Sequence, residues 1–264
     1  MRIRSTFGVF LLVCCLTVCA QGESKVTPVT LTVLYDNQGA HESLTKDWGF
    51  SCLIRGLEKV ILFDTGAKGP ILVENARRLG VNLSEVDIVV LSHAHGDHTG
   101  GLGALLEQVP KAVVYLPPDP SPIVRRQTAA RTAQVFPAMQ QNRELCPGAI
   151  LTGVLGEKIK EHALAVRSPR GWVVLTGCAH PGIERIVEKV ADSIGGRIHL
   201  IAGGFHLLDK TPAEVEAVAA RLKELKVQKA AASHCTGASA VNILKAKFGA
   251  DFVPLGLGVT LVID

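Results

Sequence analysis

The amino-acid sequence predicts an α/β sandwich in which sheets lie inside and helices outside. Short apolar segments rich in β-branched residues alternate with segments of helical periodicity, and no linker divides the two halves of the chain. This rhythm is typical of domains whose sheets are covered by helices. The 264 residues, 47% of them hydrophobic, are enough for one such domain.

The first half begins with strands. Thr30–Tyr35 is β-branched and alternating, and it predicts the first strand. Phe50–Ile54 and Lys59–Asp64 bracket a glycine and predict a hairpin. Pro70–Leu79 has the pattern of a helix, which Gly80 ends. A buried strand, a helix stopped by a proline and a further strand are predicted next, over Ile88–Leu91, Gly101–Val109 and Ala112–Leu116.

The segment Pro117–Pro147 interrupts this rhythm. It holds six prolines and several arginines, and it predicts an excursion from the core of the kind that forms lids. Beyond it, Thr211 and Glu214 form a capping box that begins a helix. The remaining strands and helices are predicted over Trp172–Leu175, Ile183–Ile194, Ile198–Ala202, Ala230–Ser233, Ala238–Phe248 and Thr260–Ile263.

Residues 1–20 predict a signal peptide. Arg2 and Arg4 precede an apolar run that is too short to span a bilayer as a helix and that ends in small residues at Ala20. We therefore expect one domain of residues 21–264, exported to the periplasm or secreted. Lipid attachment at Cys19 is the less favoured alternative. Export permits disulfides, but the irregular spacing of the cysteines at 52, 146, 178 and 235 does not decide whether any form.

The net charge of +4 is scattered along the chain. A nucleic-acid-binding surface needs clustered basic residues, so we exclude nucleic acids as partners. The expected partner is a small-molecule substrate, and we expect no membrane span.

The segment from Ser92 to Gly101 carries the strongest functional signal. His93, His95, Asp97 and His98 fall within six residues, directly after a predicted buried strand. Imidazole and carboxylate groups suit zinc and similar metals. Residues two apart in an extended turn project to one side, so His93 and His95 can reach one metal. Asp97 and His98 lie past the turn and can face a second metal.

Three later histidines share one context. His180, His206 and His234 each follow a predicted strand and stand beside small residues. Strand ends gathered at one sheet edge are where α/β folds place their sites, so we expect these imidazoles near the first motif. The histidines that lack this context are interpreted as surface or packing residues, namely His41, His162 and His199.

Two further residues have alternative interpretations. Asp64 ends a strand in Phe63-Asp64-Thr65-Gly66 and is either a turn former or an acceptor that holds a ligand imidazole. Cys178 could ligate a soft metal, although a buried small apolar role is favoured.

These residues resemble the metallo-β-lactamase superfamily. The motif His93-Ala-His95-Gly-Asp97-His98 is specific for it, and the Asp-Thr-Gly segment lies upstream as in that fold. Within the superfamily, the chain resembles the branch named after dihydropterin ribofuranosylaminobenzene phosphate synthase, on segments 48–51, 176–182, 203–207 and 233–237. The resemblance implies a metallo-β-lactamase-type four-layer αβ/βα sandwich with the metals at one edge.

The resemblance also implies a ligand set. In it, one metal would be held by His93, His95 and His180, and the other by Asp97, His98 and His234. His206 would replace one of these ligands or contact the substrate. Two departures, Gly96 and Leu116–Pro120, lie near the expected substrate, so substrate identity does not carry over. The cytoplasmic cofactor pathway that names the branch does not suit an exported protein.

The leading functional hypothesis is hydrolysis by a hydroxide that two divalent metals activate, with Asp97 orienting the nucleophile. The substrate would be an ester, a lactone or a phosphate-bearing small molecule. Zinc is the expected metal, with manganese or iron as alternatives. The first alternative function is a pterin-directed transferase that forms a C–N bond, and the second is a non-catalytic metal- or ligand-binding protein. No Gly-x-Ser-x-Gly segment is present, which disfavours a serine mechanism.

Overall fold

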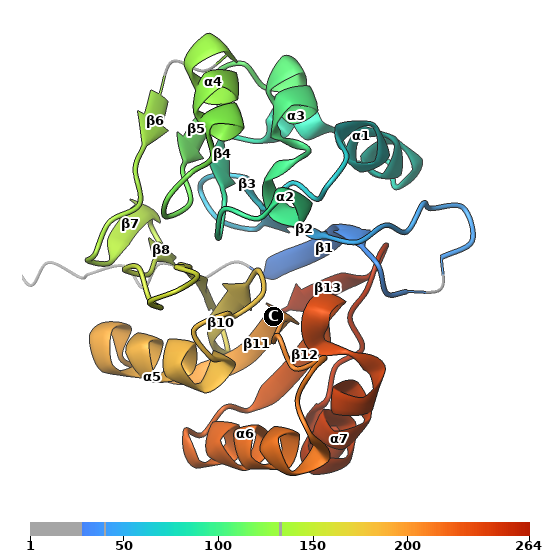
Figure 1. Ribbon diagram of the computed structural model, residues 1–264, viewed down its shortest axis with the longest axis vertical. Coiled ribbons are helices and arrows are strands. Elements are labelled where there is room, and N and C mark those ends of the chain that lie inside the picture. The colour runs from blue at the N-terminus through green and yellow to red at the C-terminus, as the bar shows by residue number, and fades with distance from the viewer. Residues whose placement is uncertain (1–27, 40, 132–133) are drawn as a thin grey trace, which may run out of the picture.

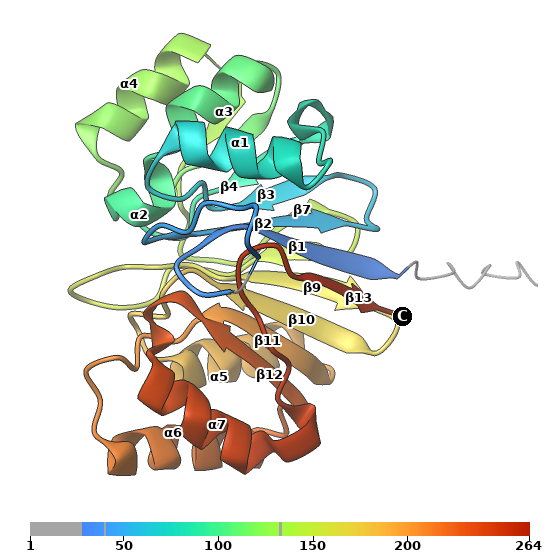
Figure 2. The same ribbon diagram turned by 90° about the vertical axis from the view of Figure 1, so that its right-hand side faces the viewer.

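Figure 1 shows the computed structural model of the protein, which describes residues 28–39, 41–131 and 134–264. The expected signal peptide, residues 1–20, lies outside the described residues. Two β-sheets pack face to face, and helices cover the outer face of each (Figures 1 and 2). The predicted α/β sandwich is therefore confirmed, with four layers in the order helix, sheet, sheet, helix.

The first sheet has seven strands in the order β13-β1-β2-β3-β4-β5-β6. Strands β1, β2 and β3 pair antiparallel in sequence, whereas β3 to β6 pair parallel. The strands are β1 (Val29–Asp36), β2 (Phe50–Arg55), β3 (Ile61–Phe63), β4 (Ile88–Val90), β5 (Val113–Tyr115), β6 (Gln134–Phe136) and β13 (Thr260–Ile263).

The second sheet has six strands in the order β12-β11-β10-β9-β8-β7. Its strands β10, β11 and β12 pair parallel to one another. The strands are β7 (Arg143–Cys146), β8 (Ala149–Leu151), β9 (Leu164–Ser168), β10 (Gly171–Thr176), β11 (Ile198–Gly204) and β12 (Lys229–Ser233).

Helices α1 to α4 lie on the outer face of the first sheet, and α5 to α7 lie on that of the second (Figure 1). Their bounds are α1 (Gly69–Arg78), α2 (Gly96–Thr99), α3 (Leu102–Gln108), α4 (Pro122–Arg131), α5 (Ile183–Ile194), α6 (Pro212–Glu224) and α7 (Ala238–Phe248). Short 3-10 turns lie at Leu83–Glu85, His234–Thr236 and Gly249–Asp251. The predicted capping box at Thr211 is present at the start of α6. None of the helices in the described residues is long and apolar enough to cross a membrane.

Three apolar clusters hold the layers together. One fills the space between the sheets and includes Val33, Phe63 and Val173. The other two lie between each sheet and its helices, and they include Leu72 on the first side and Ile186 on the second. Because the central strands are buried on both faces, their sequences are continuously apolar rather than alternating.

The structure corrects the interpretation of Pro117–Pro147 as an excursion from the core. This segment carries the chain from one sheet to the other: it contains α4, adds β6 to the edge of the first sheet and begins the second sheet with β7. Strands β6 to β9 were not predicted. Strands β6 and β7 are partly buried edge strands, so their side chains show little alternation between apolar and polar.

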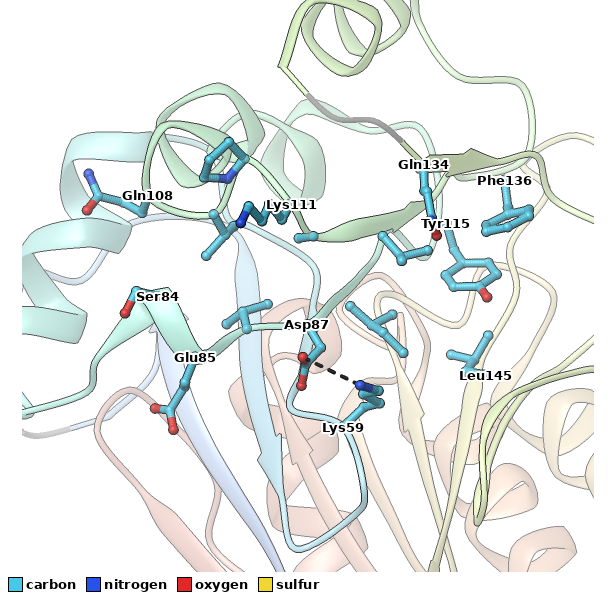
Figure 3. A pocket seen from close by; sticks show the side chains of 16 residues that line it. Lys59, Ser84, Glu85, Asp87, Gln108, Lys111, Tyr115, Gln134, Phe136 and Leu145 are labelled. Carbon is cyan, nitrogen blue, oxygen red and sulfur yellow. Dashed lines mark ion pairs between the residues drawn. The ribbon is translucent and has the colours of Figure 1, made fainter.

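The carboxyl ends of the parallel strands meet at one edge of the sandwich. The segments that follow β3, β4, β10, β11 and β12 carry the residues that the sequence analysis selected, Asp64, His93, His180, His206 and His234. A hollow of about 690 Å³ lies at the opposite edge, where β4, β5 and β6 begin (Figure 3). It is lined by an ion pair between Lys59 Nζ and Asp87 Oδ1 at 3.9 Å, and by none of the selected residues.

Candidate metal centre

Four side chains from three segments form the first cluster of potential ligand atoms. Asp97, His98, Cys178 and His234 each offer one ligand atom, and these atoms lie within 4.8 Å of one another. Asp97 Oδ2 lies 3.5 Å from His98 Nε2 and 3.4 Å from His234 Nε2. The sequence placed Asp97 and His98 together because they are adjacent. The pairing of β10, β11 and β12 adds the other two.

A second cluster adjoins the first. His93, Cys178 and His180 also bring their ligand atoms within 4.8 Å of one another. His95 lies beside this cluster, with its Nδ1 atom 3.2 Å from His93 Nε2 and its ring centroid 4.8 Å from that of His180. The six residues that the resemblance selected as ligands are therefore gathered at one place.

Cys178 belongs to both clusters. It is buried, as expected, but its Sγ atom lies 3.2 Å from His98 Nε2 rather than in an apolar environment. A thiolate is a strong ligand for zinc and other soft metals. The structure therefore supports the ligand interpretation of Cys178, which the sequence analysis had disfavoured.

His206 lies at the side of the second cluster. Its ring centroid is 4.2 Å from that of His180, and it forms a third group of potential ligands with Cys178 and Cys235. Its backbone adopts φ = 51°, which is uncommon for a residue other than glycine and directs the chain sharply after β11. The residue is solvent-exposed and lines two hollows beside the site.

Asp64 orients one histidine in each cluster. Its Oδ2 atom accepts hydrogen bonds from His98 Nδ1 and from Ser92 Oγ, both at 2.7 Å. Since the Ser92 hydroxyl donates to Asp64, its oxygen accepts from His93 Nδ1 at 2.9 Å. Both imidazoles are thus held through Nδ1, and their Nε2 atoms lie among the other potential ligand atoms. The structure favours the acceptor interpretation of Asp64, although its φ of 58° shows that it also forms the turn.

Asn37 and Trp48 surround His234, and the sequence analysis selected neither. Asn37 Oδ1 accepts a hydrogen bond from His234 Nδ1 at 2.8 Å, which leaves Nε2 free. The Trp48 ring lies 4.8 Å from the His234 ring and is 47% exposed. Asn37 follows β1, so its position after a strand was a usable signal. Trp48 lies in a loop and begins segment 48–51, which carried part of the family resemblance, but that resemblance gave it no role in the site.

A buried carboxylate is a third feature that the sequence analysis missed. Glu161 is fully buried, and it accepts hydrogen bonds from the backbone of the loop after β10. Burial raises its pKa, whereas the backbone N–H groups of Ala179 and His180 act in the opposite direction. No residue spacing near Glu161 indicates these contacts.

Two nitrogen atoms test whether this site fits a metal. Nε2 of His180 and Nε2 of His234 are buried and have no hydrogen-bond partner among the described residues. A buried polar atom without a partner costs about 1–3 kcal/mol, which a bound cation would offset. The donor set of imidazole, carboxylate and thiol suits a divalent metal such as zinc. The residues therefore fit a metal site.

The pKa values of three potential ligands show which of them would have to lose a proton to a metal. Burial and the neighbouring His206 lower the pKa of His180 to about 3, so this imidazole is neutral at neutral pH. Burial alone would raise the pKa of Asp97, but the neighbouring imidazoles of His234 and His98 hold it well below its usual range. Burial also opposes protonation of His98, yet Asp64 raises its pKa to about 10. A metal at His98 Nε2 would therefore displace a proton.

A cleft extends from the site toward α5. Two adjoining hollows of about 460 and 470 Å³ share His180, Pro181, Arg185 and His206. Lys158 also lines one of them. Among the described residues, no carboxylate forms an ion pair with Arg185 or Lys158. The cleft thus joins Arg185 and Lys158 to the metal site, although Glu157 lines one hollow and Glu184 and Glu214 line the other.

Comparisons with known proteins agree with this geometry. Residues 49–134 match the family model described as "Metallo-beta-lactamase superfamily". The chain is 27% identical to the 7,8-dihydropterin-6-methyl-4-(beta-D-ribofuranosyl)-aminobenzene-5'-phosphate synthase of Methanocaldococcus jannaschii, over 86% of this chain and 94% of the relative. It is also 27% identical to a solved structure, Tm1679, described as a metal-dependent hydrolase of the beta-lactamase superfamily. That similarity covers 89% of this chain and 100% of the other, with a TM-score of 0.75.

A more distant structure shares the fold. The metallo-beta-lactamase fold protein YhfI of Bacillus subtilis has a TM-score of 0.65 at 16% identity, over 89% of this chain and 99% of that one. The paired sheets, the gathered ligand residues and these similarities support one conclusion. The chain has the metallo-β-lactamase fold and resembles the metal-dependent enzymes of that superfamily.

Proposed function

We propose that the protein is a transferase that joins a planar heterocycle to a phosphate-bearing partner: an amine nitrogen of the partner displaces a leaving group from an activated carbon of the heterocycle, so that a C–N bond forms as the bond to the leaving group breaks and the amine proton is released. The observation that carries this proposal is the similarity to the M. jannaschii synthase, because it spans 86% of this chain and 94% of the relative. The printed name of that relative combines a dihydropterin with a ribofuranosyl-aminobenzene phosphate. This similarity favours the transferase alternative over the hydrolase that the sequence analysis placed first.

The surroundings of the candidate metal centre support such substrates. Trp48 presents a half-exposed aromatic face beside His234, where a flat heterocycle can stack. On the other side of the centre, Arg185 and Lys158 offer positive charge to a phosphate group. A substrate pair would then meet at the metal edge, with the heterocycle near β12 and the phosphate near α5.

We further propose that the centre holds two divalent metals, and zinc is the metal that best suits this set of ligands. His93, His95 and His180 would hold one, and Asp97, His98 and His234 the other. Cys178 belongs to both groups of potential ligand atoms and could serve either metal. Bound metals would supply Lewis acidity and charge neutralisation for anionic groups of the substrate. The ionised Asp97 carboxylate would orient the nucleophile and accept its hydrogen bond, since its side chain is 18% exposed.

Hydrolysis is the second candidate function. It is favoured by the 27% identity to the structure described as a metal-dependent hydrolase. The side chains around the expected substrate do not separate the two reactions, because a stacking tryptophan and the basic side chains Arg185 and Lys158 suit either one.

Export of the mature chain is also part of the proposal. A mature protein that begins near residue 21 outside the cytoplasm would need a planar substrate other than the cytoplasmic cofactor precursor. Intact mass of natively expressed protein in each cell fraction tests this. An unprocessed chain in the cytosol would contradict export and would favour the biosynthetic substrate itself.

Product analysis of the metal-loaded protein tests the reaction. The panel contains an activated dihydropterin with a ribofuranosyl-aminobenzene 5'-phosphate, together with phosphodiester, lactone and ester substrates. A coupled product detected by mass spectrometry supports the transferase. Hydrolysis products without coupling support the second candidate, and a metal-free protein with undiminished turnover would contradict both.

Trp48 provides a matched pair of variants for the same assay. Trp48→Ala removes the stacking face and should raise KM for the heterocycle about 10-fold, consistent with about 1–3 kcal/mol for stacking of a flat base on an aromatic ring. Trp48→Phe keeps an aromatic face and should restore most of the affinity. Metal content should stay unchanged in both variants, because Trp48 offers no ligand atom.

A further inference from the structure

Glu161 is a fully buried carboxylate whose hydrogen-bond partners all belong to one loop. Its Oε1 atom accepts from the backbone N–H groups of Gly177, Cys178 and Ala179, at 3.0, 3.1 and 3.0 Å. Its Oε2 atom accepts from the N–H of His180 at 2.9 Å. A buried carboxylate costs free energy unless several donors compensate it, and here four donors from four consecutive residues do so.

This loop carries two of the potential metal ligands, and its backbone is unusual. Ala179 has φ = 58°, a conformation that costs free energy for a residue with a side chain. The loop also approaches the other half of the site closely: a Cβ atom on Gly177 would lie 2.1 Å from Ser92 Oγ. The Glu161 carboxylate thus holds Cys178 and His180 on a loop that would otherwise have four N–H groups to satisfy.

The next residue contacts the other ligand loop. The backbone N–H of His162 donates to the carbonyl oxygen of Ser92 at 3.1 Å. Its Nε2 atom donates to the carbonyl oxygen of Leu91 at 2.8 Å, within the segment that leads from β4 to His93. The His162 side chain is fully buried. Two adjacent residues therefore bind both loops that carry ligands, one from each sheet.

We propose that Glu161, with His162, is a positioning residue of the metal centre: it sets Cys178 and His180 at the distance from His93 that a metal requires. The inference rests on the proposed metal centre. Glu161 offers no atom to the metal, since both of its oxygens accept backbone hydrogen bonds. It acts by fixing ligand geometry before a metal arrives, so that binding does not have to order the loop. Loss of such supporting contacts typically costs 10–100-fold in metal affinity.

Glu161→Gln is the direct test, because glutamine has nearly the same shape. Its amide carries one oxygen, so at least one backbone N–H of the loop would face an NH₂ group. Ser168→Ala is the matched control: Ser168 is also buried and donates to a backbone oxygen, that of Gly171, at the turn between β9 and β10. Both variants lose a buried hydrogen bond, but only one should change the metal centre.

The measurement is titration of chelator-treated protein with Co²⁺, followed by the thiolate-to-cobalt absorption band, which Cys178→Ala identifies. We expect the affinity of Glu161→Gln for the ion that reports this band to fall about 10–100-fold. Ser168→Ala should keep wild-type affinity despite any loss of thermal stability. Glu161→Asp, which retains the charge but is shorter, should give an intermediate affinity and replaces the glutamine variant if that one does not fold.

The outcomes separate this inference from the proposed function. Wild-type protein that binds no Co²⁺ would refute the metal centre itself. Wild-type protein that binds Co²⁺ with the band, while Glu161→Gln and Glu161→Asp show the same affinity and the same band, would overturn the positioning role alone. An equal loss of affinity in Ser168→Ala would assign the effect to general destabilisation and would also overturn it.

Discussion

Replacement of His162 should change how the stability of the protein depends on pH. The imidazole is fully buried, and burial lowers its pKa from the ordinary 6.5 to about 4. The unfolded chain therefore takes up a proton at a higher pH than the folded chain does. The contribution of the neutral His162 imidazole to the free energy of unfolding is therefore fully present above pH 6.5. It is lost as the pH falls from 6.5 to about 4.

The magnitude follows from this shift. Each pKa unit corresponds to about 1.4 kcal/mol. At about pH 5, which lies about 1.5 units below the ordinary pKa and above the folded one, the imidazole should lower the free energy of unfolding by about 2 kcal/mol. Asp36 acts in the opposite sense, because burial raises its pKa from 3.8 to about 6 and its contribution is lost as the pH rises through that window. Asp36 is present in both the wild type and a His162 variant, so its effect cancels when the two proteins are compared.

His162→Gln is the suitable variant, since its amide can still donate to the Leu91 carbonyl oxygen but does not titrate. The assay is urea unfolding, followed by tryptophan fluorescence, of chelator-treated wild type and variant at about pH 7.5 and about pH 5. Chelator treatment removes the proton linkage of metal binding. The wild type should lose about 2 kcal/mol more than the variant between these values. Equal losses in the two proteins would show that His162 is not the buried neutral group described above.

Three further perturbations test the metal centre and its packing. Asp64→Asn should weaken metal binding about 10–100-fold without unfolding the protein, because the carboxylate that orients His98 becomes an amide. Competition with a chelating dye measures the metal affinity, and an unchanged affinity would contradict this role of Asp64. Gly204→Ala should destabilise the fold by about 1–3 kcal/mol in urea unfolding, since the new Cβ would lie 2.7 Å from Cys235 Sγ. Oxidation of the metal-free protein with oxidised glutathione should link Cys178 to Cys235, because their sulfur atoms lie within 4.8 Å of each other, and should block metal rebinding. The Cys235→Ala variant should still rebind metal after the same treatment, and an equal loss of rebinding in that variant would exclude this disulfide.

The features that could be predicted are those encoded within short segments, because such segments do not depend on the rest of the chain. His93, His95, Asp97 and His98 lie within six residues, so a single turn gathers them whatever the rest of the chain does. The alternation of strands and helices likewise follows from apolar periodicity, which each segment carries alone. The ligand histidines that end later strands were predictable because parallel strands bring their carboxyl ends to one edge.

Edge strands and supporting residues depended on the tertiary structure. Strands β6 to β9 are defined by pairing with their neighbours rather than by a pattern of their own. Cys178 has the same sequence character as a buried apolar cysteine, and only the position of its Sγ atom 3.2 Å from His98 Nε2 indicates ligand chemistry. Trp48 and Asn37 contact His234, which is almost 200 residues away in the chain.

The sequence by itself therefore determined the sandwich, the metal motif and the edge at which the site lies, because these depend on periodicity and on short spacings. Only the tertiary structure decided how Glu161 and His162 connect the two ligand loops. Their partners are backbone N–H and carbonyl groups, which every residue possesses and which no side-chain pattern can single out. Such contacts are specified by the packing of one sheet against the other, and so they appear only when the whole chain has folded.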